Sequence, residues 1–199
     1  MKLNTFSKAL VAVFPLAMVT PPQASPADKI GACSVEAVAK ASADYKCEAQ
    51  TRSGPVAWQV VAVLQGERTF RVWKDLKSGL YVSDDLGKHS PTAAIKDHLC
   101  TSPEYASHRG NLGGVGWRLP TGYPRKLNGK KSFPQQDSDF VTLEADGIRQ
   151  VVPGLMNKWF VSSSEAEGDG FFYGFDGEFG GIDYTCYGNG NVSVRCVGQ

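Results

Sequence analysis

The stretch Gly116-Trp117-Arg118-Leu119-Pro120-Thr121 decides the fold of this chain, because it joins a large aromatic, a permanent cation and a rigid turn-former. Trp117 has the most surface to bury, so we expect it in a core. Pro120 fixes its own φ and biases Leu119 toward an extended backbone. Arg118 presents five donors in a planar fork, which need acceptors where the side chain is buried. Such a block is costly to build unless the fold is organised around it, so it indicates architecture more than ligand.

Short helices and strands are predicted on both sides of this block. Apolar and capping patterns predict helices over residues 34–41, 90–99 and 137–146. Valine-rich and aromatic runs predict strands over residues 56–64, 69–73, 79–83 and 159–163. The tail predicts successive antiparallel strands over residues 171–175, 180–187 and 191–197, with Gly188-Asn189-Gly190 as the last turn.

The first 27 residues have the pattern of an export signal. Lys2 and Lys8 accompany an apolar run over residues 9–19 that is too short to span a bilayer, and small residues follow. An uncleaved membrane anchor is the alternative. We expect residues 1–27 to be removed, no membrane span afterwards, and a location in the periplasm, at the cell surface or outside the cell.

The charge balance argues against two classes of partner. The chain has 21 basic and 20 acidic side chains, and removal of residues 1–27 takes away Lys2 and Lys8 and no acid. The remaining 19 basic and 20 acidic side chains give a net charge of −1. That is no electrostatic footprint for nucleic acid or for an anionic membrane surface.

Five cysteines in an exported chain predict disulfides and one odd thiol. We expect Cys33 and Cys47, which are close in sequence, to pair. A bond between Cys100 and Cys196 would close a loop of nearly a hundred residues, worth roughly 4–5 kcal/mol on the chain-entropy model. Cys186 and Cys196 pairing across a hairpin is the alternative. We favour Cys100–Cys196, with Cys186 as the free thiol.

Several blocks in one order resemble a known bacterial domain family. They are residues 72–83, a helix ending in Cys100, residues 116–121, residues 159–164 and the closing Val194-Arg195-Cys196-Val197. This order resembles the DUF1566 family, also described as the C-terminal domain of a Legionella collagen-like adhesin. The match covers roughly residues 69–199. The segment usual there as Thr-Gly-Leu-Met-Trp stands here as Ser78-Gly79-Leu80-Tyr81-Val82.

The resemblance implies a disulfide-stapled α+β fold of the C-type lectin kind, related also to formylglycine-generating enzymes. Two helices would pack on a small twisted antiparallel sheet with long loops. The helix cysteine and the terminal cysteine of such domains commonly pair, which supports Cys100–Cys196. Trp117 and Trp159 would be core residues, and Arg118 would bind loop carbonyls or a carboxylate internally. The implied division is a signal peptide (1–27), an N-terminal extension with a short helix and strand (28–68) and the lectin-like domain (69–199).

Acidic and aromatic side chains alternate in the glycine-rich tail. Carboxylates in such loops are ligands for Ca²⁺, and exposed rings form platforms for sugars or proteins. The acidic tripeptide motifs with which C-type lectins bind sugar through calcium are absent, so we expect no cofactor and keep Ca²⁺ as an alternative. The acidic tract comprises Glu165, Glu167, Asp169, Asp176, Glu178 and Asp183. We place the ligand-binding residues at Tyr173, Phe175, Asp176, Glu178, Asp183 and Tyr184.

Patterns typical of enzymes are weak. His89, His98 and His108 have no metal-ligand spacing, and Gly-x-Ser-x-Gly is absent. The copper-binding cysteine pair of formylglycine-generating relatives resembles Cys186 and Cys196 only superficially. We expect no catalytic residues.

The sequence thus predicts a non-enzymatic binding or adhesion module for a glycan or a cell-surface protein. A basic run, Arg125, Lys126, Lys130 and Lys131, is a candidate contact for sulfated polysaccharide. One alternative is an accessory subunit of an envelope or fimbrial assembly, in which Cys186 mediates a homo- or hetero-oligomer. The other is a metal-dependent oxidase related to formylglycine-generating enzymes.

Overall fold

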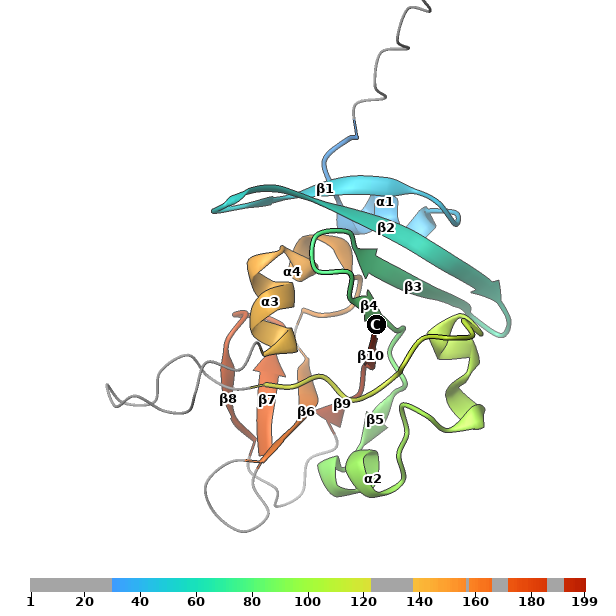
Figure 1. Cartoon of the computed structure of the whole chain (residues 1–199), viewed down its shortest axis with the longest axis vertical. Helices are drawn as coiled ribbons and strands as arrows, with labels where there is room; N and C mark the ends of the chain where they lie inside the picture. Colours follow the sequence, from blue (N-terminus) through green and yellow to red (C-terminus); the bar gives the residue numbers. More distant parts are fainter. Residues whose placement is uncertain (1–29, 123–137, 157, 166–171, 186–191) are drawn as a thin grey trace, which may run out of the picture.

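A computed structural model describes residues 30–122, 138–156, 158–165, 172–185 and 192–199 (Figure 1). Within them the chain forms an α+β fold with two five-stranded sheets and short helices. The α+β class is as expected, whereas the expectation of two helices on a single small sheet is wrong. None of the described helices has the length and apolarity to cross a bilayer. The proposed signal, residues 1–27, lies outside the described residues.

The first sheet has the order β1-β2-β3-β4-β10. Its neighbouring strands pair in antiparallel fashion, and the long β2 carries the alternation of buried and half-buried side chains expected of a strand with one face on a core. Its strands are β1 (Lys46–Thr51), β2 (Gly54–Gln65), β3 (Thr69–Asp75), β4 (Tyr81–Val82) and β10 (Val197–Gly198).

The second sheet has the order β5-β9-β6-β7-β8. The pair β6–β9 is parallel and the others are antiparallel. The predicted strand over residues 191–197 is therefore divided: its first part joins this sheet and its last residue begins β10 of the other sheet. The strands are β5 (Lys88–His89), β6 (Trp159–Glu165), β7 (Phe172–Asp176), β8 (Ile182–Thr185) and β9 (Val192–Ser193).

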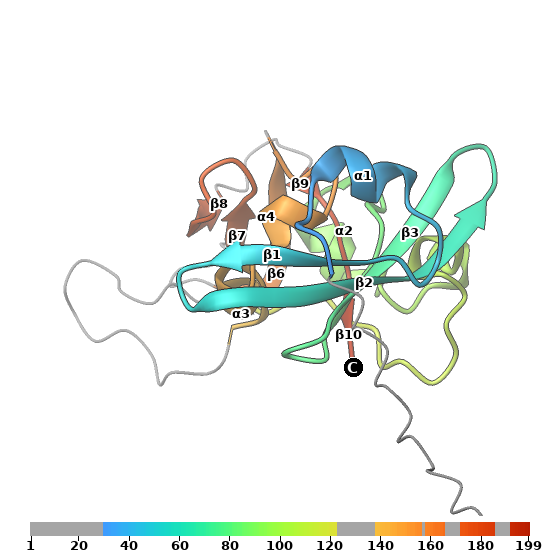
Figure 2. The same ribbon diagram turned by 90° about the horizontal axis from the view of Figure 1, so that it is seen from above.

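Serine caps begin three of the four described α-helices. The hydroxyl oxygens of Ser34, Ser90 and Ser138 each accept a hydrogen bond from the backbone three residues on. Figures 1 and 2 show α3 and α4 between the long β1–β2 hairpin and strands β6–β8. The helices are α1 (Val35–Lys40), α2 (Pro91–Lys96), α3 (Asp139–Ala145) and α4 (Ile148–Val151), with 3₁₀ turns η1 (Pro103–Tyr105) and η2 (Ser107–Arg109).

Two hydrophobic clusters make up the core. The larger one joins α1, β2, α3, α4, β6 and β7, and the rings of Phe140 and Phe175 stack in it with centroids 4.8 Å apart. The second one surrounds Cys100 and Cys196 and includes Val72, Trp117 and Val161. Because Phe160 belongs to the first cluster and Val161 to the second, β6 separates the two.

Residues 30–65 belong to the same sheet and core as the rest. The hairpin of β2 and β3 pairs residues on either side of position 68, and Val38 of α1 lies in the larger cluster beside Leu143 and Phe160. The proposed boundary between an extension (28–68) and a domain (69–199) therefore does not correspond to a break in the structure.

The described cysteines form two disulfides, both as predicted. Cys33 joins Cys47 with Cα atoms 4.8 Å apart, and Cys100 joins Cys196 with Cα atoms 5.5 Å apart across a separation of 96 residues. The second bond links the segment after α2 to the residue before β10. Cys186, the proposed free thiol, lies outside the described residues.

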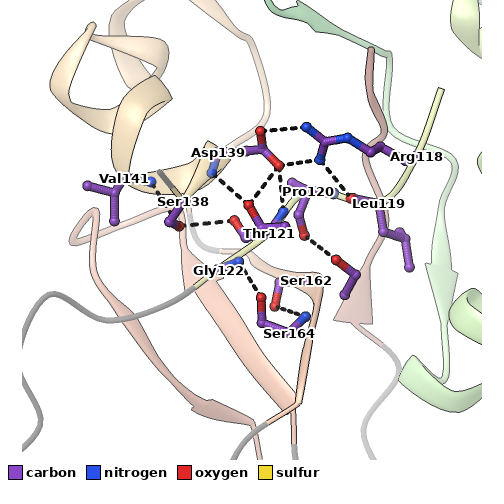
Figure 3. Close-up of polar contacts among 11 residues, drawn as sticks. Arg118, Leu119, Pro120, Thr121, Gly122, Ser138, Asp139, Val141, Ser162 and Ser164 are labelled. Carbon is purple, nitrogen blue, oxygen red and sulfur yellow. Dashed lines mark hydrogen bonds and ion pairs between the residues drawn. The ribbon is translucent and has the colours of Figure 1, made fainter. Parts of the chain in front are cut away.

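The Gly116–Thr121 block connects the two sheets (Figure 3). Arg118 exchanges both backbone hydrogen bonds with Val197 of β10, at 2.9 Å each. Two residues on, the carbonyl of Pro120 accepts from the amide of Ser163 in β6 at 2.9 Å. Trp117 is 8% exposed and lies in the second cluster, as predicted. The block is thus organised as the sequence suggests, with its ring in the core and its backbone shared between sheets.

Candidate functional site

A groove of about 850 Å³ opens between the β1–β2 turn, α3, the start of α4 and the β7–β8 turn. Figure 1 shows the tip of the β1–β2 hairpin and the end of the β7–β8 hairpin on the same side of the molecule as α3. The lining of the groove is mixed in polarity. The lining residues are Gln50, Thr51, Arg52, Ser53, Phe140, Val141, Glu144, Ala145, Gly147, Arg149, Gln150, Phe179, Gly180 and Ile182.

The β1–β2 turn holds Arg52 at the rim of the groove. The hydroxyl of Thr51 donates to the carbonyl of Gly54 at 2.6 Å and accepts from the amide of Ser53 at 3.2 Å, which fixes the tight turn. Arg52 sits at the tip and is exposed. Its guanidinium makes no hydrogen bond or ion pair within the described part of the chain, so its donors are available.

Gln150 of α4 closes the outer edge of β1. Its side-chain Oε1 accepts from the amide of Gln50 at 2.9 Å, and its Nε2 donates to the carbonyl of Gln50 at 2.7 Å. The side chain thus satisfies both outward backbone groups of an edge strand. Gly147 permits the close approach, because a Cβ there would lie 2.6 Å from the Cβ of Ala49.

Glu144 and Arg149 form an ion pair in the wall of the groove. The Nε of Arg149 lies 3.0 and 2.9 Å from the two carboxylate oxygens of Glu144, and Nη2 lies 2.7 Å from Oε1. The hydrogen bonds with Glu144 raise the pKa of Arg149. The remaining Nη1 donates to the carbonyl of Glu178 at 3.0 Å. The pair therefore carries no net charge, and its polar atoms form hydrogen bonds within the protein.

The β7–β8 turn forms the opposite wall and carries an exposed ring. The Oδ1 of Asp176 accepts from the amides of Glu178 and Phe179 at 2.8 and 3.2 Å. Gly180 has a φ of +74° and packs directly on the Glu144 carboxylate. Phe179 is 75% exposed, so most of its ring is in contact with water. Its ring is the large apolar surface that the groove offers to a partner.

The aromatic part of the sequence prediction is wrong for two residues. Tyr173 and Phe175 are fully buried, because they share the face of β7 that packs on Phe140 and Phe160. Their rings therefore form no exposed platform. Tyr184 pairs with Tyr173 through its backbone, and its side chain lies outside the described residues.

The predicted acidic residues divide between the turn and the neighbouring strand. Asp176 and Glu178 lie in the turn that bounds the groove, where Asp176 acts as a cap for the backbone. Asp183 is exposed and lies opposite Gly174 in β8, on the face of the sheet away from Phe175. The structure thus places Asp176 and Glu178 in the turn beside the groove, but neither they nor Asp183 is among the residues that line it.

The three residues with a predicted structural role behave differently. Trp117 is buried, and Arg118 binds the Asp139 carboxylate and the carbonyl of Leu119, as expected. Trp159 is not a core residue: it is 37% exposed at the start of β6, opposite Asp176, beyond the edge of the second cluster.

The described residues contain neither a cluster of metal ligands nor the cysteine pair of the oxidase alternative. No group of three or more His, Cys, Asp and Glu side chains that could hold a metal ion occurs among them. Cys196 is bonded to Cys100, so it is not paired with Cys186 as the oxidase alternative requires. Glu167, Asp169 and the basic run Arg125, Lys126, Lys130 and Lys131 lie outside the described residues, as does the side chain of Glu165.

None of the residues that line the groove is among the predicted ligand-binding residues, and Arg52 and Gln150 illustrate why. Arg52 and Gln150 belong to β1–β2 and α4, and neither β1 nor α4 was predicted. The run Thr51-Arg52-Ser53-Gly54 is typical of a turn and is the signal that could have placed Arg52 at a hairpin tip. The contact between Gln150 and Gln50 spans 100 residues and has no local signal.

Comparison with known proteins gives no match. No family model matches the chain, and no curated protein and no solved structure matches it. The function must therefore be argued from the groove.

Proposed function

We propose that this protein is an exported, non-enzymatic binding or adhesion module that takes a glycan or a cell-surface protein in the groove between the β1–β2 and β7–β8 turns. The observation that carries the proposal is Phe179, 75% exposed at the rim of an 850 Å³ groove. A large ring in that position costs free energy in water and is explained by a partner that covers it.

Rigid support of the groove favours binding. Gln150 ties α4 to β1, and the Glu144–Arg149 pair ties α3 and α4 to the β7–β8 turn. A site whose walls are already held loses little conformational entropy when a partner binds. The disulfides Cys33–Cys47 and Cys100–Cys196 fit an oxidising compartment, which agrees with export.

The resemblance to the DUF1566 and collagen-like adhesin domains supports the same reading. The resemblance implies a lectin-like scaffold that presents long loops. We extend that reading to this chain as part of the proposal, with the β1–β2 and β7–β8 turns as the presented segments.

An array that carries both glycans and the ectodomains of surface proteins tests the proposal. We expect labelled protein to be retained on a defined subset of features, and Phe179→Ala to weaken that retention by roughly tenfold, as expected for the loss of an aromatic contact worth about 1.5 kcal/mol. Met156→Ala, which removes another exposed apolar side chain that does not line the groove, is the matched control. Retention on no feature, or equal retention of both variants, contradicts the proposal.

A further inference from the structure

Several hydrogen-bonding groups of the groove are already used within the protein, although among the described residues the side-chain amide of Gln50 and the guanidinium of Arg52 are not. The amide of Gln150 binds the backbone of Gln50, and the Glu144 carboxylate binds Arg149. The hydroxyls of Thr51 and Ser53 lie 3.0 Å apart and bond to each other. A polar ligand that needs these atoms must first break the internal bonds, so each hydrogen bond that it makes with them contributes little net free energy of binding.

What the groove leaves unused is apolar surface. Phe179 is exposed at one side, Ala145 is exposed on α3, and Val141 and Ile182 are half-buried between them. Burial of such surface stabilises a complex by about 25 cal/mol per Å² before the costs of association. The ligand therefore has at least one apolar side chain or face.

The one lining cation whose charge is not balanced within the described residues is Arg52. Arg149, the other cation of the groove, is neutralised by Glu144. An exposed guanidinium at the rim attracts carboxylates and binds them in two-pronged geometry. The electrostatic complement of the groove is thus an anionic group next to an apolar one.

We propose that the groove binds a segment of a protein partner in which a carboxylate side chain lies next to an apolar side chain, with Arg52 on the carboxylate and Phe179 on the apolar group. This inference rests on the proposed function and chooses between its two classes of partner. A sugar ring carries a hydroxyl on most of its carbons and needs a dense set of free hydrogen-bonding groups, whereas the described lining of this groove offers apolar surface, the cation of Arg52 and the side-chain amide of Gln50.

Selection from a display library of randomised peptides tests the inference with the purified full chain as bait. We expect the selected sequences to be enriched in Asp or Glu beside Leu, Ile, Val or Phe. Synthetic versions of the best sequences then bind in solution, and replacement of their Asp or Glu by Asn or Gln weakens binding. The loss is greater at low salt, because a rim-exposed ion pair is screened by salt.

Matched variants assign the two contacts. Arg52→Gln lowers the affinity for the acidic peptides by roughly three- to fivefold, which is the effect of losing one exposed ion pair. The affinity for their neutral versions does not change. Arg52→Glu shifts the selected sequences from acidic to basic residues. Phe179→Ala lowers the affinity for the acidic and the neutral peptides alike. Lys46→Gln, which removes an exposed cation at the far end of β1, changes none of these affinities.

The outcomes separate this inference from the proposed function. Peptides that bind without regard to their charge, or equally to Arg52→Gln, overturn the inference. Selection of no peptide, together with retention of glycans that Phe179→Ala abolishes, also overturns it while the proposed function stands. Binding of neither peptides, surface proteins nor glycans overturns both.

Discussion

Arg118 and Asp139 form a two-pronged ion pair that joins the Gly116–Thr121 block to the first residue of α3 (Figure 3). The Nη2 of Arg118 lies 2.9 Å from Oδ1 of Asp139, and Nη1 binds the other carboxylate oxygen. The second oxygen also accepts from the amide and the hydroxyl of Thr121, at 2.7 and 2.9 Å. The carboxylate is buried and the guanidinium half-exposed, so the two partners differ in what their loss leaves behind.

Removal of the carboxylate should cost more than removal of the guanidinium. Asp139→Ala leaves the amide and hydroxyl of Thr121 without their acceptor and removes an acid from the first turn of α3, and we expect a loss of about 3 kcal/mol in the free energy of unfolding. Arg118→Ala leaves a carboxylate that still accepts from the amide and the hydroxyl of Thr121, and we expect the free energy of unfolding to fall by about 1–2 kcal/mol. Urea unfolding of both variants and of the double variant measures the order and the coupling. The reverse order would show that the block is held by Arg118 through its other contact, the carbonyl of Leu119.

The two disulfides should contribute unequally. The Cys100–Cys196 bond spans 96 residues and the Cys33–Cys47 bond spans 14. On the chain-entropy model the longer loop contributes about 4–5 kcal/mol and the shorter about 3 kcal/mol. We expect the double serine variant at positions 100 and 196 to lower the urea midpoint more than the one at positions 33 and 47. Mass mapping of a digest without reductant checks both bonds directly, and a peptide that links Cys196 to Cys186 would contradict the structure.

The local elements of the fold were more predictable than the residues of its site. The strand β1, with the sequence Lys46-Cys47-Glu48-Ala49-Gln50-Thr51, has one β-branched residue and no large apolar one, so its own pattern does not mark it. It is a strand because it pairs along its whole length with the valine-rich β2. Tertiary pairing, which no short window contains, decided this element.

The phase of a strand was harder to predict than its existence. Residues 171–175 are aromatic at four of five positions, so alternation says that half point inward without saying which half. Phe175 points inward because α3 places Phe140 over it. In β6 both faces are covered at Phe160 and Val161, and Trp159 is exposed only because it lies beyond the second cluster. The partner of Arg118 is 21 residues away and likewise has no local signal.

Acid should favour the folded state through Asp75. Burial raises the pKa of this carboxyl, and the neighbouring Asp146 raises it further, although the hydroxyl of Ser78 and the amide of Lys77 act in the opposite direction. A group whose folded pKa is raised contributes stability below its unfolded pKa, near 4, and that stability is lost as the pH rises through the folded pKa. The difference in unfolding free energy between the native chain and Asp75→Asn should therefore grow in favour of the native chain as the pH falls toward 4.

Asparagine is a suitable replacement at this position. Its carbonyl oxygen keeps the bond from the amide of Lys77, which is 2.9 Å long in the native chain. Its amide takes the place of the oxygen that accepts from the Ser78 hydroxyl, and it carries no charge beside Asp146. Asp97→Asn, which neutralises an exposed carboxylate after α2, is the control variant. Chemical unfolding between pH 4 and pH 8 measures both differences. A difference that grows with rising pH would mean that Asp75 is stabilised as the anion.

Gly180 should be costly to replace in the groove wall. Its φ of +74° is unfavourable for any side chain, and a Cβ there would enter the ion pair of Glu144 and Arg149. Gly154 has nearly the same φ, +75°, with open space around it. Gly154→Ala therefore measures the backbone cost alone, about 1 kcal/mol. We expect Gly180→Ala to lower the free energy of unfolding by roughly 1–2 kcal/mol more than Gly154→Ala does, because it also separates the paired charges of Glu144 and Arg149 in the wall of the groove.

The same pair of variants tests whether the Glu144–Arg149 pair supports the site. If the displaced ion pair no longer holds the β7–β8 turn, Phe179 loses its fixed position, and the affinity for any ligand selected on the native chain falls for Gly180→Ala while Gly154→Ala binds normally. Thermal unfolding and binding are measured on the same preparations. Equal stability of the two alanine variants would show that the turn moves away from the ion pair at no cost, in which case the wall of the groove is adaptable rather than preformed.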